Sequence, residues 1–309
     1  MARLLALLLL ASSAALPLRP VPERLAPWTT ALREQQPENP FVAVYRIGRH
    51  RLVFVAAQHD ERNDSPTFRV IRAAYAAFRF DTVIAEGFPA SWGINPARVV
   101  DDALNSVPAS DGFVEGGETV PTIVGAHAQG AAIIGGEQDD LDIKAQVLAT
   151  GFDPDDLLGF YVLRNIPQWI EERKIADVGD PRLEPLIVKA LIRNRERLGL
   201  PSATLTDFRQ WSAWYRAANR KPLDAGFSTE EAGPLADGRF ATNKIAYAVS
   251  RARDAYLHGL IITHLNAGKN VLVVFGGSHL MIHRPALDAV LGPPCYVGAE
   301  IKPAVLPCK

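Results

Sequence analysis

The sequence predicts an α/β protein whose core sheet is interrupted by a helical insertion. Residues 52–86 have the pattern of a strand, a helix and a second strand, and such a βαβ unit implies parallel neighbours in one sheet. Two further apolar runs, 131–137 and 270–275, have the length and composition of core strands. Between them, residues 153–218 have a helical pattern. We therefore predict one α/β domain over residues 41–309, with the insertion at about 153–240.

The first elements are a predicted hairpin and the βαβ unit. Residues 41–47 and 52–57 are strand-like, and His50-Arg51 fits the turn between them. The second of these strands is apolar on both faces, as expected in a buried sheet. A helix over 65–80 starts well, because Ser65 can cap it and Pro66 suits its first turn. The short apolar strand 81–86 completes the unit.

The later elements follow the same reasoning. A helix at 121–129 leads into strand 131–137, and the insertion contains helices near 154–169, 186–198 and 208–218. A long helix at 241–267 has Gly268 as its end signal and precedes strand 270–275. A short helix at 286–291 and a strand at 295–301 are expected to close the fold.

Length, composition and charge exclude several classes of protein. The 309 residues are 48% hydrophobic, which is the composition of a globular chain and not of a disordered one. The formal net charge is −1 and the basic residues are scattered, so a nucleic-acid partner is not expected. No segment after the N-terminus reaches the length of a membrane span.

The N-terminus has the pattern of a secretory signal peptide over residues 1–15. Arg3 supplies a positive charge, the run Leu4 to Leu10 is apolar, and small residues follow where a signal peptidase cleaves. We therefore expect a periplasmic or secreted protein without a stable membrane anchor after cleavage. Residues 16–40 are rich in proline and charge and are predicted to be a flexible lead-in. In that compartment Cys295 and Cys308 can form a disulfide or remain free thiols, and the sequence does not decide between these.

Four polar residues each follow an apolar strand. They are His59, Glu86, Glu137 and His279. If the strands are parallel, all four side chains arrive at one edge of the sheet, which is where ligands bind in open α/β sheets. Glycine pairs precede Glu137 and His279, and glycine allows close backbone approach to a ligand. Each residue also has a purely structural interpretation, such as a polar turn for His59 or a strand terminus for Glu137.

Two imidazoles and two carboxylates can carry out two kinds of chemistry. As nitrogen and oxygen ligands, His59, Glu86, Glu137 and His279 can bind a divalent metal such as Zn²⁺, Mn²⁺ or Fe²⁺, which would acidify a bound water. Alternatively, a histidine paired with a carboxylate can act as a general base without metal. Arg253, on the long helix, can place its planar guanidinium over a substrate carbonyl or carboxylate, although Arg251 competes for this role.

The order of these motifs resembles the TraB/GumN and Tiki superfamily, which includes erythromycin-esterase-like and ChaN-like proteins. Its pattern has a Gly-x-x-His after an early strand, a glutamate after the next strand, a Gly-x-Glu, an Arg-Asn or Arg-Asp in a late helix, and a second Gly-x-x-His. The corresponding segments are Ala56 to His59, Ala85-Glu86-Gly87, Gly135-Gly136-Glu137, Arg253-Asp254 and Gly276 to His279. The agreement extends over residues 41–300, and Ala56 stands where the family usually has glycine.

The resemblance implies a duplicated βαβ-type core with the site between its halves. Tiki-like members are metal-dependent proteases, erythromycin-esterase-like members hydrolyse a lactone with histidine and glutamate, and ChaN-like members bind haem. We therefore expect a hydrolase of ester or amide bonds that acts on a small molecule or peptide. Of the two mechanisms we prefer the metal-dependent one. The residues expected to carry out the reaction are His59, Glu86, Arg253 and His279. The alternatives are a haem-, iron- or other ligand-binding protein and a non-catalytic accessory protein of the same fold.

Overall fold

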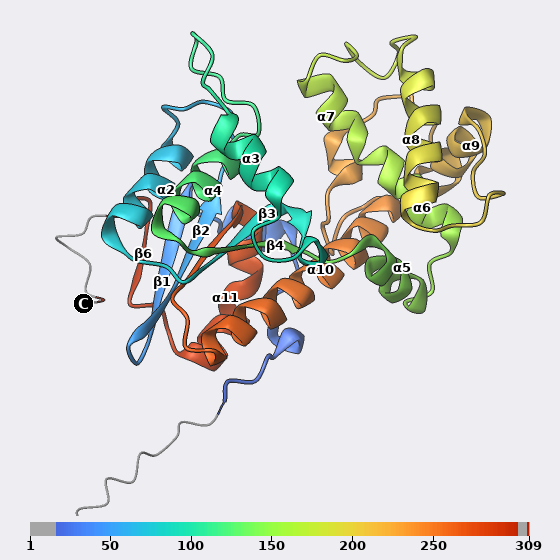
Figure 1. Cartoon of the computed structure of the whole chain (residues 1–309). Helices are drawn as coiled ribbons and strands as arrows, with labels where there is room; N and C mark the ends of the chain where they lie inside the picture. Colours follow the sequence, from blue (N-terminus) through green and yellow to red (C-terminus); the bar gives the residue numbers. More distant parts are fainter. Residues whose placement is uncertain (1–16, 302–307, 309) are drawn as a thin grey trace, which may run out of the picture.

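A six-stranded mixed sheet forms the centre of the protein, whose computed structural model describes residues 17–301 and 308 (Figure 1). The strands are β1 (Phe41–Ile47), β2 (His50–Ala57), β3 (Thr82–Pro89), β4 (Ala132–Glu137), β5 (Val271–Gly276) and β6 (Tyr296–Gly298). Their order is β4-β3-β5-β2-β1-β6. The pairs formed by β4, β3, β5 and β2 are parallel, whereas β1 is antiparallel to both β2 and β6. The predicted α/β class is confirmed.

The sheet contains the predicted hairpin and a modified form of the predicted βαβ unit. β1 pairs with β2 so that Tyr45 lies opposite Leu52. β2 and β3 run in the same direction, but they are not neighbours because β5 lies between them. Leu272 of β5 pairs with Val53 on one side and with Val83 on the other. The carboxyl ends of β2, β5, β3 and β4 consequently lie along one edge of the sheet.

Helices cover both faces of the sheet (Figure 1). Those on one face are α2 (Pro66–Ala77), α3 (Ala97–Asn105) and α4 (Thr119–Gln129), and those on the other are α10 (Ala241–Asn266) and α11 (Gly277–Leu291). Along β2, Val53 and Val55 pack toward α2 and α4, whereas Leu52 and Phe54 pack toward α10 and α11. Both faces of this strand are therefore buried, which explains why its sequence is continuously apolar.

The predicted insertion forms a helical lobe beside the sheet (Figure 1). The lobe begins before the predicted bound of 153, with α5 (Asp140–Ala149), a helix that we did not predict. Its other helices are α6 (Pro154–Leu163), α7 (Asn165–Glu171), α8 (Leu183–Arg197) and α9 (Phe208–Asn219), followed by the short η3 (Thr229–Ala232). Trp211 and Tyr215 are fully buried at the centre of a separate apolar cluster in this lobe. The long α10 contacts α5 and α6 as well as β4 and β5, so it joins the lobe to the sheet.

Residues 17–40, which we predicted to be a flexible lead-in, are anchored in the structure. This segment contains η1 (Pro22–Arg24) and α1 (Thr30–Glu34), and Leu25 and Trp28 are buried against α11. Arg251 of α10 donates hydrogen bonds to the carbonyls of Leu25 and Pro22 at 2.8 and 2.6 Å. The prolines and charges of this segment led to the prediction of a flexible lead-in. Its few apolar side chains, however, pack on the surface of α11.

The predicted signal peptide, residues 1–15, lies outside the described residues. Among the residues that are described, no helix combines the length and apolar character needed to cross a bilayer.

The last helix begins earlier than predicted. We expected it at 286–291, whereas α11 starts at Gly277, immediately after β5, with Gly276 as its N-cap residue. Pro285 lies inside this helix and interrupts the helical pattern of the sequence, because proline lacks a backbone N–H and is disfavoured in helix interiors. His279 therefore lies in the first turn of a helix and not in a loop.

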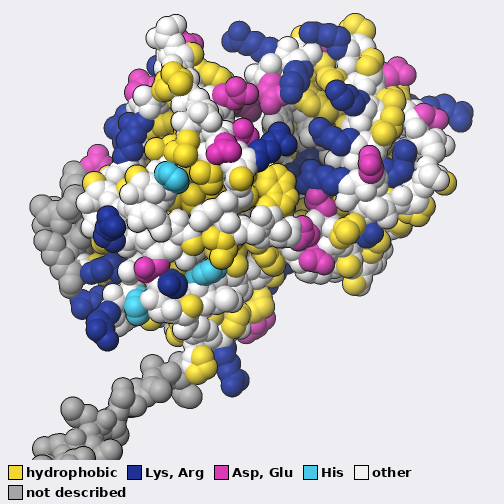
Figure 2. Space-filling view, in the orientation of Figure 1, with side chains coloured by type: hydrophobic (Ala, Val, Ile, Leu, Met, Phe, Trp, Pro, Cys, Tyr) yellow, Lys and Arg dark blue, Asp and Glu magenta, His cyan; other side chains and the backbone are white. Residues whose placement is uncertain are grey.

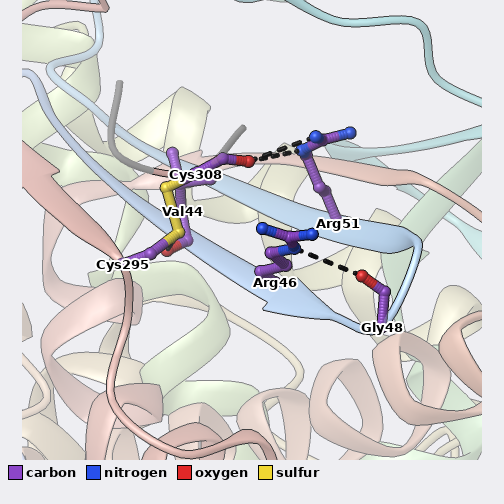
Figure 3. Close-up of a disulfide and its surroundings, with 6 residues drawn as sticks. All are labelled: Val44, Arg46, Gly48, Arg51, Cys295 and Cys308. Atoms are coloured by element: carbon purple, nitrogen blue, oxygen red, sulfur yellow. Dashed lines mark hydrogen bonds between the residues drawn. A yellow bond between two sulfur atoms is a disulfide. The ribbon is translucent and has the colours of Figure 1, made fainter. Parts of the chain in front are cut away.

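A disulfide between Cys295 and Cys308 resolves the question that the sequence left open (Figure 3). The amide of Cys295 donates a hydrogen bond to the carbonyl of Val44 in β1 at 2.9 Å. Arg51 of β2 donates from Nε and Nη2 to the carbonyl of Cys308 at 3.3 and 3.1 Å. The disulfide and these hydrogen bonds thus hold Cys308 against the β1–β2 hairpin.

Replacing both cysteines by serine is expected to destabilise the fold without changing it. The disulfide joins residues 13 apart in sequence, and closing a loop of this length in the unfolded chain corresponds to about 3 kcal/mol. Urea denaturation followed by circular dichroism should show this loss in the free energy of unfolding. Reducing the wild-type protein should give the same loss, and an unchanged midpoint in both experiments would contradict the expectation.

Candidate active site

The predicted site residues converge at the carboxyl edge of the parallel strands. His59 lies just beyond β2, Glu86 lies within β3, Glu137 ends β4, and His279 lies in the first turn of α11 after β5. Arg253 reaches the same place from α10. Glu86 is their common neighbour: its Oε1 lies 3.7 Å from His279 Nε2 and 3.2 Å from Arg253 Nη2, and its Oε2 lies 4.0 Å from His59 Nε2.

The Glu86 carboxylate stays ionised because donors and positive charges surround it. The backbone N–H of Gly276 donates to its Oε2 at 2.7 Å. Burial raises the pKa of Glu86, but the positive charges of His279 and Arg253 lower it by more, and the net shift is downward. An anionic carboxylate is therefore fixed at the centre of the site.

Glycine at position 276, the last residue of β5, leaves room for two functional side chains. A Cβ atom there would lie 2.9 Å from Nε2 of His59 and 3.5 Å from Oε2 of Glu86. The first of these distances is shorter than a van der Waals contact, so a larger residue would displace the His59 imidazole. The glycine pair at the end of β5 thus allows the backbone to lie close to both side chains, as the sequence pattern indicated.

Glu137 is bound to Arg253 through two parallel hydrogen bonds. Arg253 Nε lies 2.6 Å from one carboxylate oxygen and Nη2 lies 2.5 Å from the other. Burial lowers the pKa of Arg253, but the charge of Glu137 raises it by more. The net shift is upward, so the guanidinium remains cationic. Because Arg251 binds the N-terminal segment, Arg253 is the arginine of α10 that faces Glu86.

His279 is oriented by a buried carboxylate on α10. Its Nδ1 lies 2.6 Å from Oδ1 of Asp254, so Nδ1–H donates to the carboxylate and Nε2 faces Glu86. The same oxygen lies 3.3 Å from Nε2 of His283, and Ser250 donates to Oδ2 at 3.1 Å. Burial lowers the pKa of His279, but the charge of Asp254 raises it more, and the net shift is upward. Asp254 in turn has its pKa lowered, since the two histidines outweigh its burial.

His59 has a carboxylate partner that sequence reasoning missed. Its Nδ1 lies 2.5 Å from Oε1 of Glu118, the residue just before α4. The hydrogen bond to Glu118 is the main reason why the pKa of His59 is raised to about 9. Gly116-Gly117-Glu118 repeats the Gly-Gly-Glu pattern that drew attention to Glu137, so a search for this tripeptide would have found it.

A cavity of about 810 Å³ opens over these residues between the sheet and the helical lobe. We call it the central cavity; it is lined by His59, Glu86, Glu118, Glu137, Arg253 and Arg164, among others. Figure 2 shows charged side chains of both signs on the walls of the hollow between the two parts of the molecule. The imidazole of His59 is 65% exposed, so a substrate in this cavity can reach it directly.

The side chains that we predicted as metal ligands are not arranged as a coordination shell in this geometry. Both oxygens of Glu137 bind Arg253, and a guanidinium beside Glu86 opposes a second cation there. Within residues 17–301 and 308, no group of three or more histidine, cysteine, aspartate or glutamate side chains is placed to hold a metal ion. Binding of a divalent metal or of haem stays a prediction.

Comparison of the chain with family models, with curated proteins and with solved structures finds no match. The resemblance to the TraB/GumN superfamily therefore stays a prediction based on five short motifs. The interpretation of the site depends on the contacts and charges described above.

Proposed function

We propose that this protein is an exported hydrolase that cleaves an ester or amide bond at the site around Glu86. One observation carries the proposal: two imidazole–carboxylate pairs, His59–Glu118 and His279–Asp254, face opposite oxygens of one ionised carboxylate. A carboxylate behind an imidazole fixes its tautomer and stabilises its protonated form, which suits proton transfer. The guanidinium of Arg253 supplies positive charge at the same place.

His59 is the proposed general base. The 4.0 Å between its Nε2 and Oε2 of Glu86 suits a water molecule hydrogen-bonded to both atoms. In its neutral form His59 takes one proton from this water, and the oxygen attacks the carbonyl carbon of the substrate. Glu118 stabilises the imidazolium that results, as the raised pKa of His59 indicates.

The remaining charged groups suit the second half of the reaction. Attack converts the carbonyl oxygen into an oxyanion, which Arg253 can stabilise because its positively charged guanidinium lines the central cavity, whereas the nearly buried His279 faces Glu86 and holds that carboxylate in place. When the tetrahedral intermediate collapses, the C–O or C–N bond breaks and His59 returns its proton to the leaving group. This sequence uses water as the only co-reactant and needs no group beyond the side chains of this chain.

The proposed compartment is the periplasm or the cell exterior. The signal-like N-terminus is the first support for export. The Cys295–Cys308 disulfide is the second, because such bonds persist in oxidising compartments. The proposed substrate is a small molecule or peptide, since the central cavity has the size of a small-ligand site.

Substituting His59 by alanine is expected to reduce kcat by about 10²- to 10⁴-fold on any ester or amide that the wild-type protein hydrolyses, because the general base is lost. Initial rates on a panel of esters and amides would measure this. The fold should be retained, since His59 is largely exposed. His127→Ala is the matched control, because His127 is an exposed histidine on α4 and lies outside the site. Equal rates in wild type and His59→Ala on every substrate would eliminate the proposal.

Substituting Glu118 by glutamine is expected to move the pH profile of kcat/KM to lower pH. In the wild type, the active neutral form of His59 accumulates as pH rises through its pKa of about 9, so kcat/KM should rise up to that value. Glutamine keeps the shape of Glu118 but removes the charge that favours the imidazolium, which lowers the pKa of His59. Identical pH profiles in both proteins would rule out His59 as the titrating base. A wild-type kcat/KM that falls as pH rises through about 9 would instead indicate that His59 acts as a general acid.

A further inference from the structure

Two side arms extend the central cavity in different directions. An arm of about 560 Å³ lies between β3, η2 (Ala90–Trp92), α3 and α4, and its wall combines apolar side chains with polar ones. We call it the apolar arm after its apolar residues, which are Phe88, Trp92, Val99, Ala103 and Val120; Glu86, Asp102 and Glu115 also line it. An arm of about 580 Å³ between β4 and the helical lobe is lined by Arg164, Arg197 and Arg253 together with Glu137, Asp139 and Asp140, and we call it the basic arm after its arginines. All three cavities share Gly87, the residue after Glu86.

The three arginines of the basic arm differ in their partners. Arg253 donates two hydrogen bonds to Glu137 and one to Glu86. Arg197 forms an ion pair with Asp140. Arg164 forms no ion pair in the part of the chain that the structure describes, although it lines both the basic arm and the central cavity. It is therefore the guanidinium of this wall that is available to a ligand.

Arg164 packs against an aromatic ring. Its guanidinium carbon lies 5.2 Å from the centre of the Tyr161 ring in a cation–π contact, and the Tyr161 hydroxyl donates to Oδ1 of Asp140 at 3.1 Å. A cation–π contact uses none of the N–H donors of the guanidinium in hydrogen bonds, so these donors remain for a ligand. A planar pair of guanidinium donors matches the two oxygens of a carboxylate.

The wall of the central cavity carries charges of both signs, and its guanidinium groups differ in their partners. Arg62 forms an ion pair with Asp64, and Arg253 pairs with two glutamates. Arg164 has no such partner among the described residues. Of the guanidinium groups in this cavity, Arg164 is therefore the one left to pair with an anionic group of a ligand.

We propose that Arg164 binds a carboxylate of the substrate, so that the enzyme prefers anionic esters or amides with an apolar portion in the apolar arm. This inference rests on the proposed hydrolase function and names the substrate class of that same site. Arg164 would act in recognition and not in the chemical step, because His59, Glu86 and Arg253 surround the reacting atoms.

Two matched pairs of esters test the proposal. In the first pair, p-nitrophenyl pentanoate and mono-p-nitrophenyl glutarate differ by a carboxylate on the acyl side. In the second, phenyl acetate and 4-acetoxybenzoate differ by a carboxylate on the leaving group. Values of kcat/KM are measured for wild type, Arg164→Gln and Arg164→Lys. Arg193→Gln is the matched control, because Arg193 is an exposed arginine of α8 that lines neither the central cavity nor the basic arm.

The wild type should prefer the anionic member of at least one pair. Arg164→Gln should lower kcat/KM for that member by roughly 10- to 100-fold, the loss expected for charge-assisted hydrogen bonds, and leave its neutral match within about twofold. Arg164→Lys should fall between the two, since it keeps the charge but not the paired donors. A preference for the neutral members, or equal losses on both members of each pair, would overturn the proposal.

Calorimetric titration with glutarate and with neutral glutaramide separates this inference from the proposed function. If the wild type hydrolyses none of the esters, the ester-hydrolase proposal fails, but the carboxylate site is still tested. Glutarate binding that is retained in Arg193→Gln and lost in Arg164→Gln would support the site. Absent glutarate binding, or equal binding of glutarate and glutaramide, would refute it.

Discussion

The site depends on one negative charge, the largely buried carboxylate of Glu86. An ionised side chain inside an apolar strand is costly unless partners compensate it. Here Arg253, His279 and the N–H of Gly276 provide this compensation, and the two side chains are each held by a carboxylate of their own. Removing one partner from such a buried network typically costs about 3–5 kcal/mol, because the charge left behind is unpaired. The network therefore fixes the positions of the reactive groups as well as their ionisation.

The sheet topology brings these partners within reach of one another. Because β5 is inserted between β2 and β3, the last residue of β5, Gly276, lies beside both Glu86 and His59. Glycine at position 276 leaves space for both side chains. The start of α11 directly after β5 then turns His279 back toward α10, where Asp254 lies one residue from Arg253. One long helix thus supplies both the arginine and the carboxylate that orients the second imidazole.

The sequence predicted the location of the site but not the pairing of its side chains. The rule that ligands bind beyond the carboxyl ends of parallel strands identified His59, Glu86, Glu137 and His279, and the structure brings them to one edge. Their partners depend on distances between segments far apart in the chain. Glu137 pairs with Arg253 and is therefore not free to act as a ligand. His59 pairs with Glu118, which lies in a segment where we predicted no strand or helix. Local sequence contains no information on such distances.

The division of the molecule into two parts separates chemistry from recognition. The reactive charges are attached to strands and to α10 and α11, which the packed core of the sheet holds rigidly. One wall of the basic arm and one wall of the central cavity come from the helical lobe, whose apolar core is its own. Substitutions on the lobe surface can therefore change which ligand fits without disturbing Glu86 and its partners. A fold of this kind can retain one reaction while its substrate changes. Arg164 is attached to the helical lobe, whereas His59 and Glu86 are attached to the sheet, and each part has its own apolar core.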